Sequence, residues 1–263
     1  MLTLTNLEKT FGKGTVNEKK ALQGVNLHLD AGDFVTVLGS NGAGKSTLFG
    51  AIAGSFPLDR GSVVLDGRDI TQMPDYKRGK SIGRLFQDPL RGTAPNMTIE
   101  ENLALAYLRA SHSRSPFSTI TKKDRGEFRE RLSMLGLGLE DRMDHPVGLL
   151  SGGQRQALTL LMATLVTPKL LLLDEHTAAL DPATAEKVLA LTKKIVAENH
   201  ITCLMITHNV PSALKLGNRT VMMKDGQIIL ELSGETRVAM TPEELLKAFQ
   251  VESDRMLFSA GEH

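Results

Sequence analysis

The sequence predicts an α/β fold in which helices cover a mostly parallel β-sheet. From about residue 169 a strand, a helix and a second strand follow one another, the order that gives parallel strands joined by a covering helix. Near the N-terminus, apolar residues recur at alternating positions from Leu2 to Leu29, with a polar turn at Gly12–Gly14, which predicts an antiparallel β subdomain. Between about 88 and 167 helical periodicity replaces the strand signals. We therefore expect one domain, 1–263, with a helical subdomain at about 88–167 inserted in its core.

Shorter patterns predict the remaining elements. A strand pair is expected around Gly61–Gly67 and a further strand over Ser81–Gln87. In the helical part, residues 103–108 suit one helix and 128–135 another, with an exposed loop at Ser111–Pro116 between them. The C-terminal part predicts a strand at 169–174, a helix at 182–198, a strand at 201–207, and one or two helices from about Thr241.

Composition excludes several classes of protein. The net charge of +1 gives no electrostatic case for binding nucleic acid or an anionic membrane surface, and we expect basic stretches such as Lys77–Lys80 to be solvated. No signal peptide is apparent, and the most apolar stretch, 158–173, is interrupted by Pro168, too early for a membrane span. The only cysteine, Cys203, lies in an apolar run and is expected to be a buried thiol. These features predict a soluble, cytoplasmic chain.

One motif predicts a nucleoside triphosphate site. The pattern G-x-x-x-x-G-K-[ST] is matched after an apolar strand at 34–38 and before a helix that begins at Ser46 and Thr47. In such a loop, backbone N–H groups surround phosphate oxygens, Lys45 reaches the β- and γ-phosphates, and the Ser46 hydroxyl can ligate Mg²⁺. The matching residues are Gly39, Ser40, Asn41, Gly42, Ala43, Gly44, Lys45 and Ser46.

A second element supplies carboxylates. Four leucines lead directly to Asp174 and Glu175, so both acids lie at the end of a buried strand. Asp174 is expected in the Mg²⁺ shell, and Glu175 is expected to orient and deprotonate the attacking water.

A third motif narrows the class. Ser151, Gly152, Gly153 and Gln154 introduce a helix, with Ser151 as its N-cap, and form a second anion-binding surface. With this Ser-Gly-Gly-Gln motif the chain resembles the ATP-binding cassette (ABC) ATPases along essentially its whole length. The resemblance implies an ATPase with a P-loop NTPase core that uses ATP and Mg²⁺.

The resemblance implies further roles. Phe11 matches an aromatic residue that stacks on adenine, although core packing is the alternative for it. Gln87 matches a glutamine that contacts Mg²⁺ and reports to the membrane partner, and His208 matches a histidine that contacts the γ-phosphate. Ala179–Asp181 matches the loop through which two ATPase subunits communicate. In this family two subunits meet head to tail, each ATP lying between one phosphate loop and the partner's Ser-Gly-Gly-Gln.

One position departs from the family. His176 stands where proline commonly follows the catalytic glutamate, and either a tolerated substitution or a pH-sensing role can account for it. The Asp-Glu-His-Thr sequence at 174–177 is similar to a branch of bacterial importer ATPases that work with extracytoplasmic binding proteins, some of them for aromatic amino acids.

The combined expectation is the ATP-hydrolysing subunit of a bacterial ABC importer. It implies a homodimer, integral membrane permease subunits, an extracytoplasmic solute-binding protein, no nucleic acid, and a peripheral position on the cytoplasmic face of the membrane. Gln87, with Glu100 and Glu101 on the following helix, is expected to form the groove that receives a cytoplasmic helix of the permease. The alternatives are a soluble ABC ATPase without a transport role, or another phosphate-loop enzyme such as a kinase or GTPase, although no Asn-Lys-x-Asp motif is present.

Overall fold

The computed structural model describes residues 1–110 and 120–260, which fall into two compact units. The first unit contains Met1–Arg78 and the chain from Thr202 onward, and the second contains Gly79–Ile201. Both combine strands and helices, so the α/β class is confirmed. The first unit comprises β1 (Leu2–Phe11), β2 (Lys19–Leu29), β3 (Phe34–Gly39), α1 (Lys45–Ala53), β4 (Arg60–Leu65), β5 (Arg68–Asp69), α2 (Asp75–Arg78), β8 (Thr202–Ile206), α7 (Val210–Lys215), β9 (Arg219–Lys224), β10 (Gln227–Ser233), α8 (Gly234–Val238) and α9 (Pro242–Ala260).

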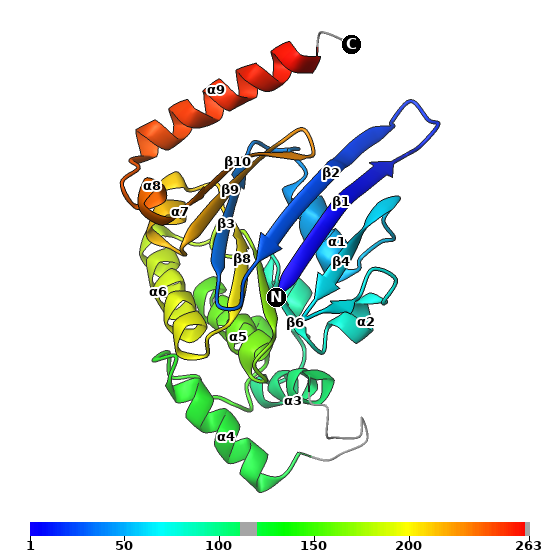
Figure 1. Ribbon diagram of the computed structural model, residues 1–263. Helices are drawn as coiled ribbons and strands as arrows, with labels where there is room; N and C mark the ends of the chain where they lie inside the picture. The colour runs from blue at the N-terminus through cyan, green and yellow to red at the C-terminus, as the bar shows by residue number, and fades with distance from the viewer. Residues whose placement is uncertain (111–119, 261–263) are drawn as a thin grey trace. The chain divides into compact units, whose positions relative to one another are not determined.

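The N-terminal strands form the predicted antiparallel sheet. Its strand order is β2-β1-β4-β5, and Figure 1 shows β2, β1 and β4 side by side. Leu4 pairs with Leu27 on one side and with Val63 on the other. The leucines at alternating positions of β1 are buried, as the sequence pattern requires of a sheet with one covered face.

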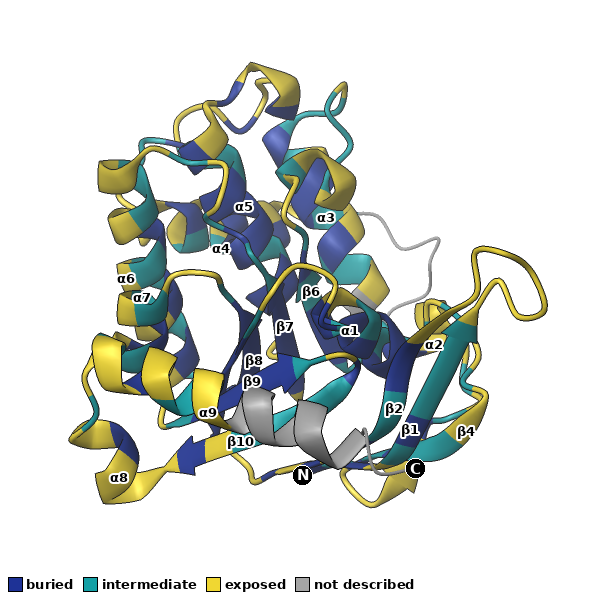
Figure 2. Cartoon of the chain, turned by 90° about the horizontal axis from the view of Figure 1, so that it is seen from above, coloured by how far each residue is buried: buried dark blue, intermediate teal, exposed yellow. Residues whose placement is uncertain are grey.

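A second set of strands in the first unit is ordered β10-β9-β3-β8. β3 runs parallel to both β8 and β9, and five of its six residues are buried. Figure 2 shows that β8 and β9 are also largely buried. Cys203 lies on β8, fully buried, and burial raises the pKa of its thiol. The hairpin β9–β10 is absent from the predicted elements. Its signal was the pair Asp225-Gly226 between two apolar runs, and both residues adopt the positive φ angles of a tight hairpin turn.

Arg78 corrects the expectation that the basic stretch Lys77–Lys80 is solvated. It is buried, and its guanidinium donates to the carbonyl oxygens of Ala51 and Ile52 at the end of α1 and to those of Thr71 and Met73. The C-terminal carbonyls of a helix lack partners within the helix, so this side chain satisfies groups that α1 leaves open.

The second unit joins a strand pair to helices. Its elements are β6 (Ile82–Leu85), the 3₁₀ turn η1 (Pro89–Gly92), α3 (Ile99–Ala110), α4 (Lys122–Ser133), the 3₁₀ turn η2 (Val147–Leu149), α5 (Gly152–Thr164), β7 (Leu170–Asp174) and α6 (Pro182–Glu198). β6 and β7 are parallel, and residues of α3, α4 and α5, including Leu103, Phe128 and Leu158, share one apolar core.

Some boundaries differ from the sequence prediction. The strand predicted to end at Gln87 ends at Leu85, and Leu135 lies just beyond α4. The tail forms the single helix α9 in the described residues, whereas the loop predicted at Ser111–Pro116 lies outside them. Within residues 1–110 and 120–260, no helix combines the length and apolar character that crossing a membrane requires.

Candidate functional site

The phosphate loop connects β3 to α1 in the first unit. Gly44 caps α1 with φ of 100°, and a Cβ on it would lie 2.5 Å from the carbonyl oxygen of Ala21, so glycine is required there. The Lys45 ammonium donates to the carbonyl oxygens of Gly39 at 2.8 Å and Ser40 at 3.0 Å, and only 5% of the residue is exposed. A sheltered positive charge at a helix N-terminus is the environment that favours phosphate.

The sheet register brings His208 to the same edge as the phosphate loop. Val37 on β3 pairs in parallel with Ile206 on β8, and Thr207 N–H donates to the carbonyl oxygen of Val37 at 3.2 Å. Gly39 and His208 each lie two residues beyond the paired positions. Parallel strands therefore place both at one sheet edge, where His208 is exposed.

Phe11, at the end of β1, is exposed but oriented by its neighbours. Its ring meets that of Phe56 edge to face, with centroids 5.2 Å apart, and the Lys9 ammonium lies 5.5 Å and 5.6 Å from the two centroids. Lys9 is itself held by Asp59 at 3.1 Å and by the carbonyl oxygen of Pro57. Phe11 is 40% exposed and so lies outside the buried core; an oriented, accessible ring suits stacking on a planar ligand.

In the second unit, Asp174 ends β7 and Glu175 follows it. Leu85 on β6 pairs with Leu173 on β7, so Gln87 and Glu175, each two residues further on, lie at one sheet edge. Glu175 has φ of 48°, in the left-handed region, and its carbonyl oxygen accepts a hydrogen bond from Ala178 N–H at 2.9 Å. The carboxylate of Asp174 and the side-chain amide oxygen of Gln87 are the hard oxygen donors that Mg²⁺ prefers.

His176 is buried against α6. Its Nε2 lies 3.1 Å from Thr192 Oγ1, and that hydroxyl donates to the carbonyl oxygen of Val188 at 2.8 Å. The hydroxyl has a single proton, so Nε2 carries the imidazole proton and donates to Thr192. Burial lowers the pKa of His176 to about 4, which leaves it neutral at physiological pH and argues against the pH-sensing alternative.

The Ser-Gly-Gly-Gln motif begins α5 as expected. Ser151 Oγ accepts from Gln154 N–H at 3.3 Å, and Gln154 Oε1 accepts from Ser151 N–H at 3.1 Å, a reciprocal cap that confirms Ser151 as the N-cap. The motif lies beside the loop before α6, since a Cβ on Gly152 would lie 3.3 Å from Leu180 Cδ2. Asp181 in that loop caps α6 through Thr184 N–H at 3.0 Å.

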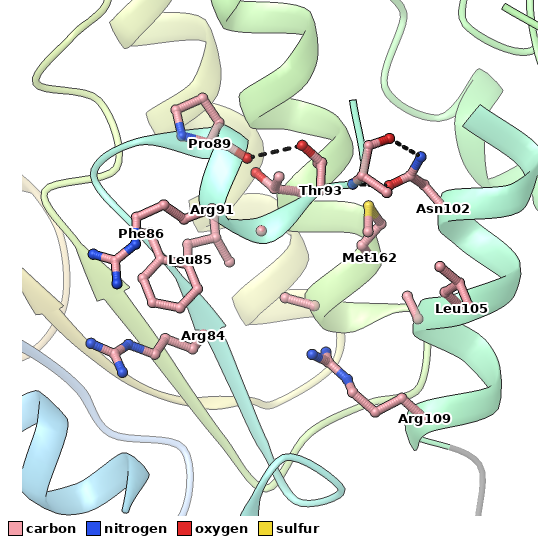
Figure 3. A pocket seen from close by; sticks show the side chains of 15 residues that line it. Arg84, Leu85, Phe86, Pro89, Arg91, Thr93, Asn102, Leu105, Arg109 and Met162 are labelled. Carbon is pink, nitrogen blue, oxygen red and sulfur yellow. Dashed lines mark hydrogen bonds between the residues drawn. The ribbon is translucent and has the colours of Figure 1, made fainter. Parts of the chain in front are cut away.

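A pocket of about 320 Å³ in the second unit lies among β6, η1, α3 and α5. Three arginines line it, together with apolar residues such as Leu105 and Met162 (Figure 3). The guanidiniums of Arg84 and Arg91 lie 4.6 Å and 5.0 Å from the Phe86 ring centroid. Figure 3 shows Arg109 extending from α3 into the same space. Among the described residues that line this pocket, none is acidic.

Glu100 and Glu101, expected to line the docking groove, do not line this pocket. Glu100 pairs with Arg125 at 2.7 Å, and Glu101 accepts from Thr98 N–H at 2.7 Å at the start of α3. Glu101 is thus engaged by the N-terminus of its own helix, and Glu100 by an arginine of α4.

The structure groups the expected residues by unit. Phe11, the phosphate loop and His208 belong to the first unit, and Gln87, Ser151–Gln154, Asp174 and Glu175 belong to the second. Sequence reasoning missed Phe56, Thr192 and the three pocket arginines. The arginines carry no motif, and only the packing of β6, η1 and α3 on α5 gathers them.

A phosphate loop before a helix, a strand ending in Asp-Glu and a capped Ser-Gly-Gly-Gln helix together define an ATP-hydrolysing cassette. Comparison with known proteins agrees. Residues 22–178 match the family model described as ABC transporter. The chain is 40% identical over 250 residues to the tyrosine transport ATP-binding protein of Clostridioides difficile, covering 95% of this chain and 99% of that protein. It is 31% identical to the choline transport ATP-binding protein OpuBA of Bacillus subtilis, covering 99% of this chain and 65% of that protein.

Solved structures give the same result. A dimeric, post-hydrolysis ATP-binding cassette bound to ADP and Pi matches with a TM-score of 0.77 at 31% identity, over 89% of this chain and 98% of that one. A nucleotide-free cassette from an ABC transporter matches with a TM-score of 0.73 at 30% identity, over 90% of this chain and 93% of that one. The chain belongs to the ABC transporter family. It is an ATP-binding and ATP-hydrolysing subunit of the importer type, and the soluble alternative is not favoured.

Proposed function

We propose that Lys45 and the backbone of Gly39–Thr47 hold the ATP phosphates, that Phe11 stacks on adenine, and that Glu175 is the general base for the attacking water. His208 contacts the γ-phosphate. The engagement of the Lys45 ammonium by two loop carbonyls supports the first role, because ATP replaces neutral acceptors with charged phosphate oxygens at the same cation. The placement of Gln87 and Glu175 at one sheet edge supports their acting together.

In the first unit the Ser46 hydroxyl, and in the second the Asp174 carboxylate and the Gln87 amide oxygen, are the groups that would hold Mg²⁺. Their oxygen chemistry fits this ion. When bound, Mg²⁺ would offset the negative charge that develops on the transferred phosphate. The 88–167 segment acts as the helical subdomain that carries the Ser-Gly-Gly-Gln motif.

Two copies of the chain form a head-to-tail dimer in which residues 151–154 of one subunit face the ATP of the other. The reciprocal cap at the start of α5 supports this role, because it fixes the backbone at the helix N-terminus while Ser151 and Gly152 stay exposed. The matching solved structure of a dimeric cassette bound to ADP and Pi also supports it.

The arginine-lined pocket receives a cytoplasmic helix of the permease, and that helix carries an acidic residue. Apolar walls at Leu105 and Met162 suit an amphipathic helix, and the lining cations Arg84, Arg91 and Arg109 favour a carboxylate on it. Docking places the chain on the cytoplasmic face of the membrane. The Gln87 backbone links this pocket to the edge that holds Glu175, since Phe86 and Pro89 on either side of it line the pocket.

The solute is an aromatic amino acid delivered by an extracytoplasmic binding protein. The single observation that carries this is the 40% identity, over nearly the full length of both chains, to a tyrosine transport ATP-binding protein. ATP-binding subunits do not contact solute, so the argument passes through the permease with which such a subunit pairs.

The experiment is co-expression of the chain with the membrane and binding proteins encoded beside it. We expect co-purification in detergent and ATP-dependent uptake of labelled tyrosine into vesicles, competed by phenylalanine. Co-purification without uptake of any aromatic amino acid would leave the ATPase role intact and contradict the assignment of the solute. A chain that never associates with a membrane protein would contradict the docking role.

A further inference from the structure

We infer that His176, through its hydrogen bond to Thr192, is a positioning residue that holds the backbone of Glu175 in its active conformation. This inference rests on the proposed role of Glu175 as the base. No contact between His176 and nucleotide is required, because the imidazole points away from the sheet edge into α6.

The backbone of Glu175 needs support. Its φ of 48° lies in the left-handed region, which is unfavourable for a residue with a side chain. Such a conformation persists only where the surrounding structure holds it. Within this turn, Ala178 N–H donates a hydrogen bond to the Glu175 carbonyl oxygen at 2.9 Å. That bond spans a short segment and can move with it.

His176 supplies a contact from outside the turn. It is the next residue after Glu175, 2% exposed, and its Nε2–H donates to Thr192 Oγ1 at 3.1 Å. Thr192 is fully buried in the middle of α6, and its hydroxyl is fixed in turn by the carbonyl oxygen of Val188 at 2.8 Å. A chain of two hydrogen bonds therefore connects the peptide that follows Glu175 to the backbone of a long helix.

The helix that receives this hydrogen bond, α6, follows the loop that contains Leu180 and Asp181. Asp181 caps α6, and Leu180 in that loop lies beside the Ser-Gly-Gly-Gln helix. A proline at position 176 would have a rigid φ but neither a backbone N–H nor a side-chain donor. Histidine thus anchors the turn by a side-chain hydrogen bond instead of by ring stiffness.

A simpler alternative is that His176 merely fills space. The two alternatives differ in what they require of the side chain. Space filling needs volume, so leucine should serve as well or better, because it removes a buried polar group. Positioning needs a hydrogen-bond donor where His176 Nε2 lies. Glutamine should serve, because its amide nitrogen lies about as far from the backbone as Nε2 does, and leucine, which has no donor, should not.

The test compares steady-state ATP hydrolysis by the purified full chain and its variants. We expect His176→Leu and Thr192→Val to lower kcat by about 10- to 100-fold, because small misplacements of a catalytic group have effects of this size. The KM for ATP and the affinity for a fluorescent ATP analogue should stay at the wild-type value, and His176→Gln should recover most of kcat. Glu175→Gln, assayed alongside, reports on the base itself.

Thr164→Val is the matched control. Thr164 is also a buried threonine whose hydroxyl donates to a carbonyl oxygen of its own helix, that of Leu160 at 2.8 Å, and it lies on α5. It should change the melting temperature as Thr192→Val does and leave kcat unchanged.

Each outcome decides between the alternatives. Wild-type kcat in His176→Leu with an inactive Glu175→Gln would overturn the positioning role and leave the base in place. Equal loss of kcat in Thr164→Val and Thr192→Val would overturn it too. Normal turnover by Glu175→Gln would remove the base and with it the inference. If His176→Leu does not fold, the comparison of Thr192→Val with Thr164→Val decides alone.

Discussion

A Cβ atom on Gly153 would overlap the Cγ2 methyl of Thr184, which lies near the start of α6 in the same chain. The sequence predicts an anion-binding surface at this motif. The structure adds a requirement for glycine within the subunit: the first turns of α5 and α6 touch at this point. Variants of Gly153 therefore affect packing in the monomer before they affect any dimer.

We expect Gly153→Ala to lower the free energy of unfolding by about 1–3 kcal/mol, the usual effect of overpacking. Gly126→Ala is the matched control, because Gly126 also lies within a helix but a Cβ there meets no atom within 4 Å. Gly126→Ala should raise the free energy of unfolding by roughly 0.5–1 kcal/mol. Thr184→Ser, which removes the methyl, should restore the free energy of unfolding of the Gly153→Ala protein, measured by urea unfolding. Additive effects of the two changes would show that the methyl is not the obstacle.

Lys45→Ala should abolish ATP binding and turnover, because it removes the cation at the N-terminus of α1. Equilibrium binding of a fluorescent ATP analogue and phosphate release measure this. Lys187→Ala, on the exposed face of α6, should behave as wild type. Near-normal turnover by a folded Lys45→Ala protein would refute the assignment of the phosphate site.

Mixed dimers should show that the Ser-Gly-Gly-Gln motif acts on the partner's nucleotide. If one chain carries Lys45→Ala and the other Ser151→Arg, the head-to-tail arrangement combines both defects in one site and leaves the second site intact. If a single chain carries both changes and pairs with wild type, each site has one defect. We expect turnover only from the first pairing, in tandem-linked or differentially tagged dimers. Equal activities would favour action within one subunit.

Arg109→Glu should weaken association with the permease and leave the ATPase rate of the isolated chain unchanged. The change reverses one of three positive charges around the pocket and repels a carboxylate on the docked helix. Detergent co-purification measures the effect. Arg129→Glu, an exposed arginine of α4 that pairs with Asp141, is the control and should co-purify normally. Stronger association of Arg109→Glu would mean that the occupant is basic.

Stability should fall in acid partly through Asp33. Burial raises the pKa of Asp33, but hydrogen bonds from Asn218 and Arg219 outweigh this, and the pKa lies below its ordinary value of 3.8. The folded state therefore binds this proton more weakly than the unfolded state. The stabilisation that the Asp33 carboxylate gives the folded state is complete at pH values above its ordinary pKa. It is lost as the pH falls below that pKa toward the pKa of the folded state. Asp33→Asn should lower the melting temperature at pH 7 more than at pH 3. Equal losses at both pH values would contradict this.

The fold was largely predictable because its strongest signals are local. Periodicity gave β1 and β2, the helix Pro182–Glu198 was predicted with its observed bounds, and Ser151 was predicted as an N-cap. The strand predicted to end at Gln87 ends at Leu85, because a polar strand end and a turn have the same composition. The hairpin after Arg219 was missed although Asp225-Gly226 marked it.

The site divides in the same way. Residues within motifs, such as Lys45 and Glu175, can be read from the sequence because their spacing is fixed by the phosphate they serve. The partners of these residues cannot. Thr192 lies 16 positions from His176 and meets it only because α6 packs beside the end of β7. Arg84 and Arg109 come together only because β6 and α3 both pack against α5.

The burial of the only thiol makes the chain a ready host for site-specific probes. Cys203 is inaccessible on β8 and its thiolate is suppressed, so maleimide reagents should not label the folded protein. A cysteine introduced at an exposed position outside the motifs, such as Lys187, would then carry a fluorophore or spin label against a silent background. Pairs of such labels in two subunits would report distance between the subunits through the ATP cycle without any change to the native core. The same thiol, left in place, would become reactive only on unfolding and would report global opening.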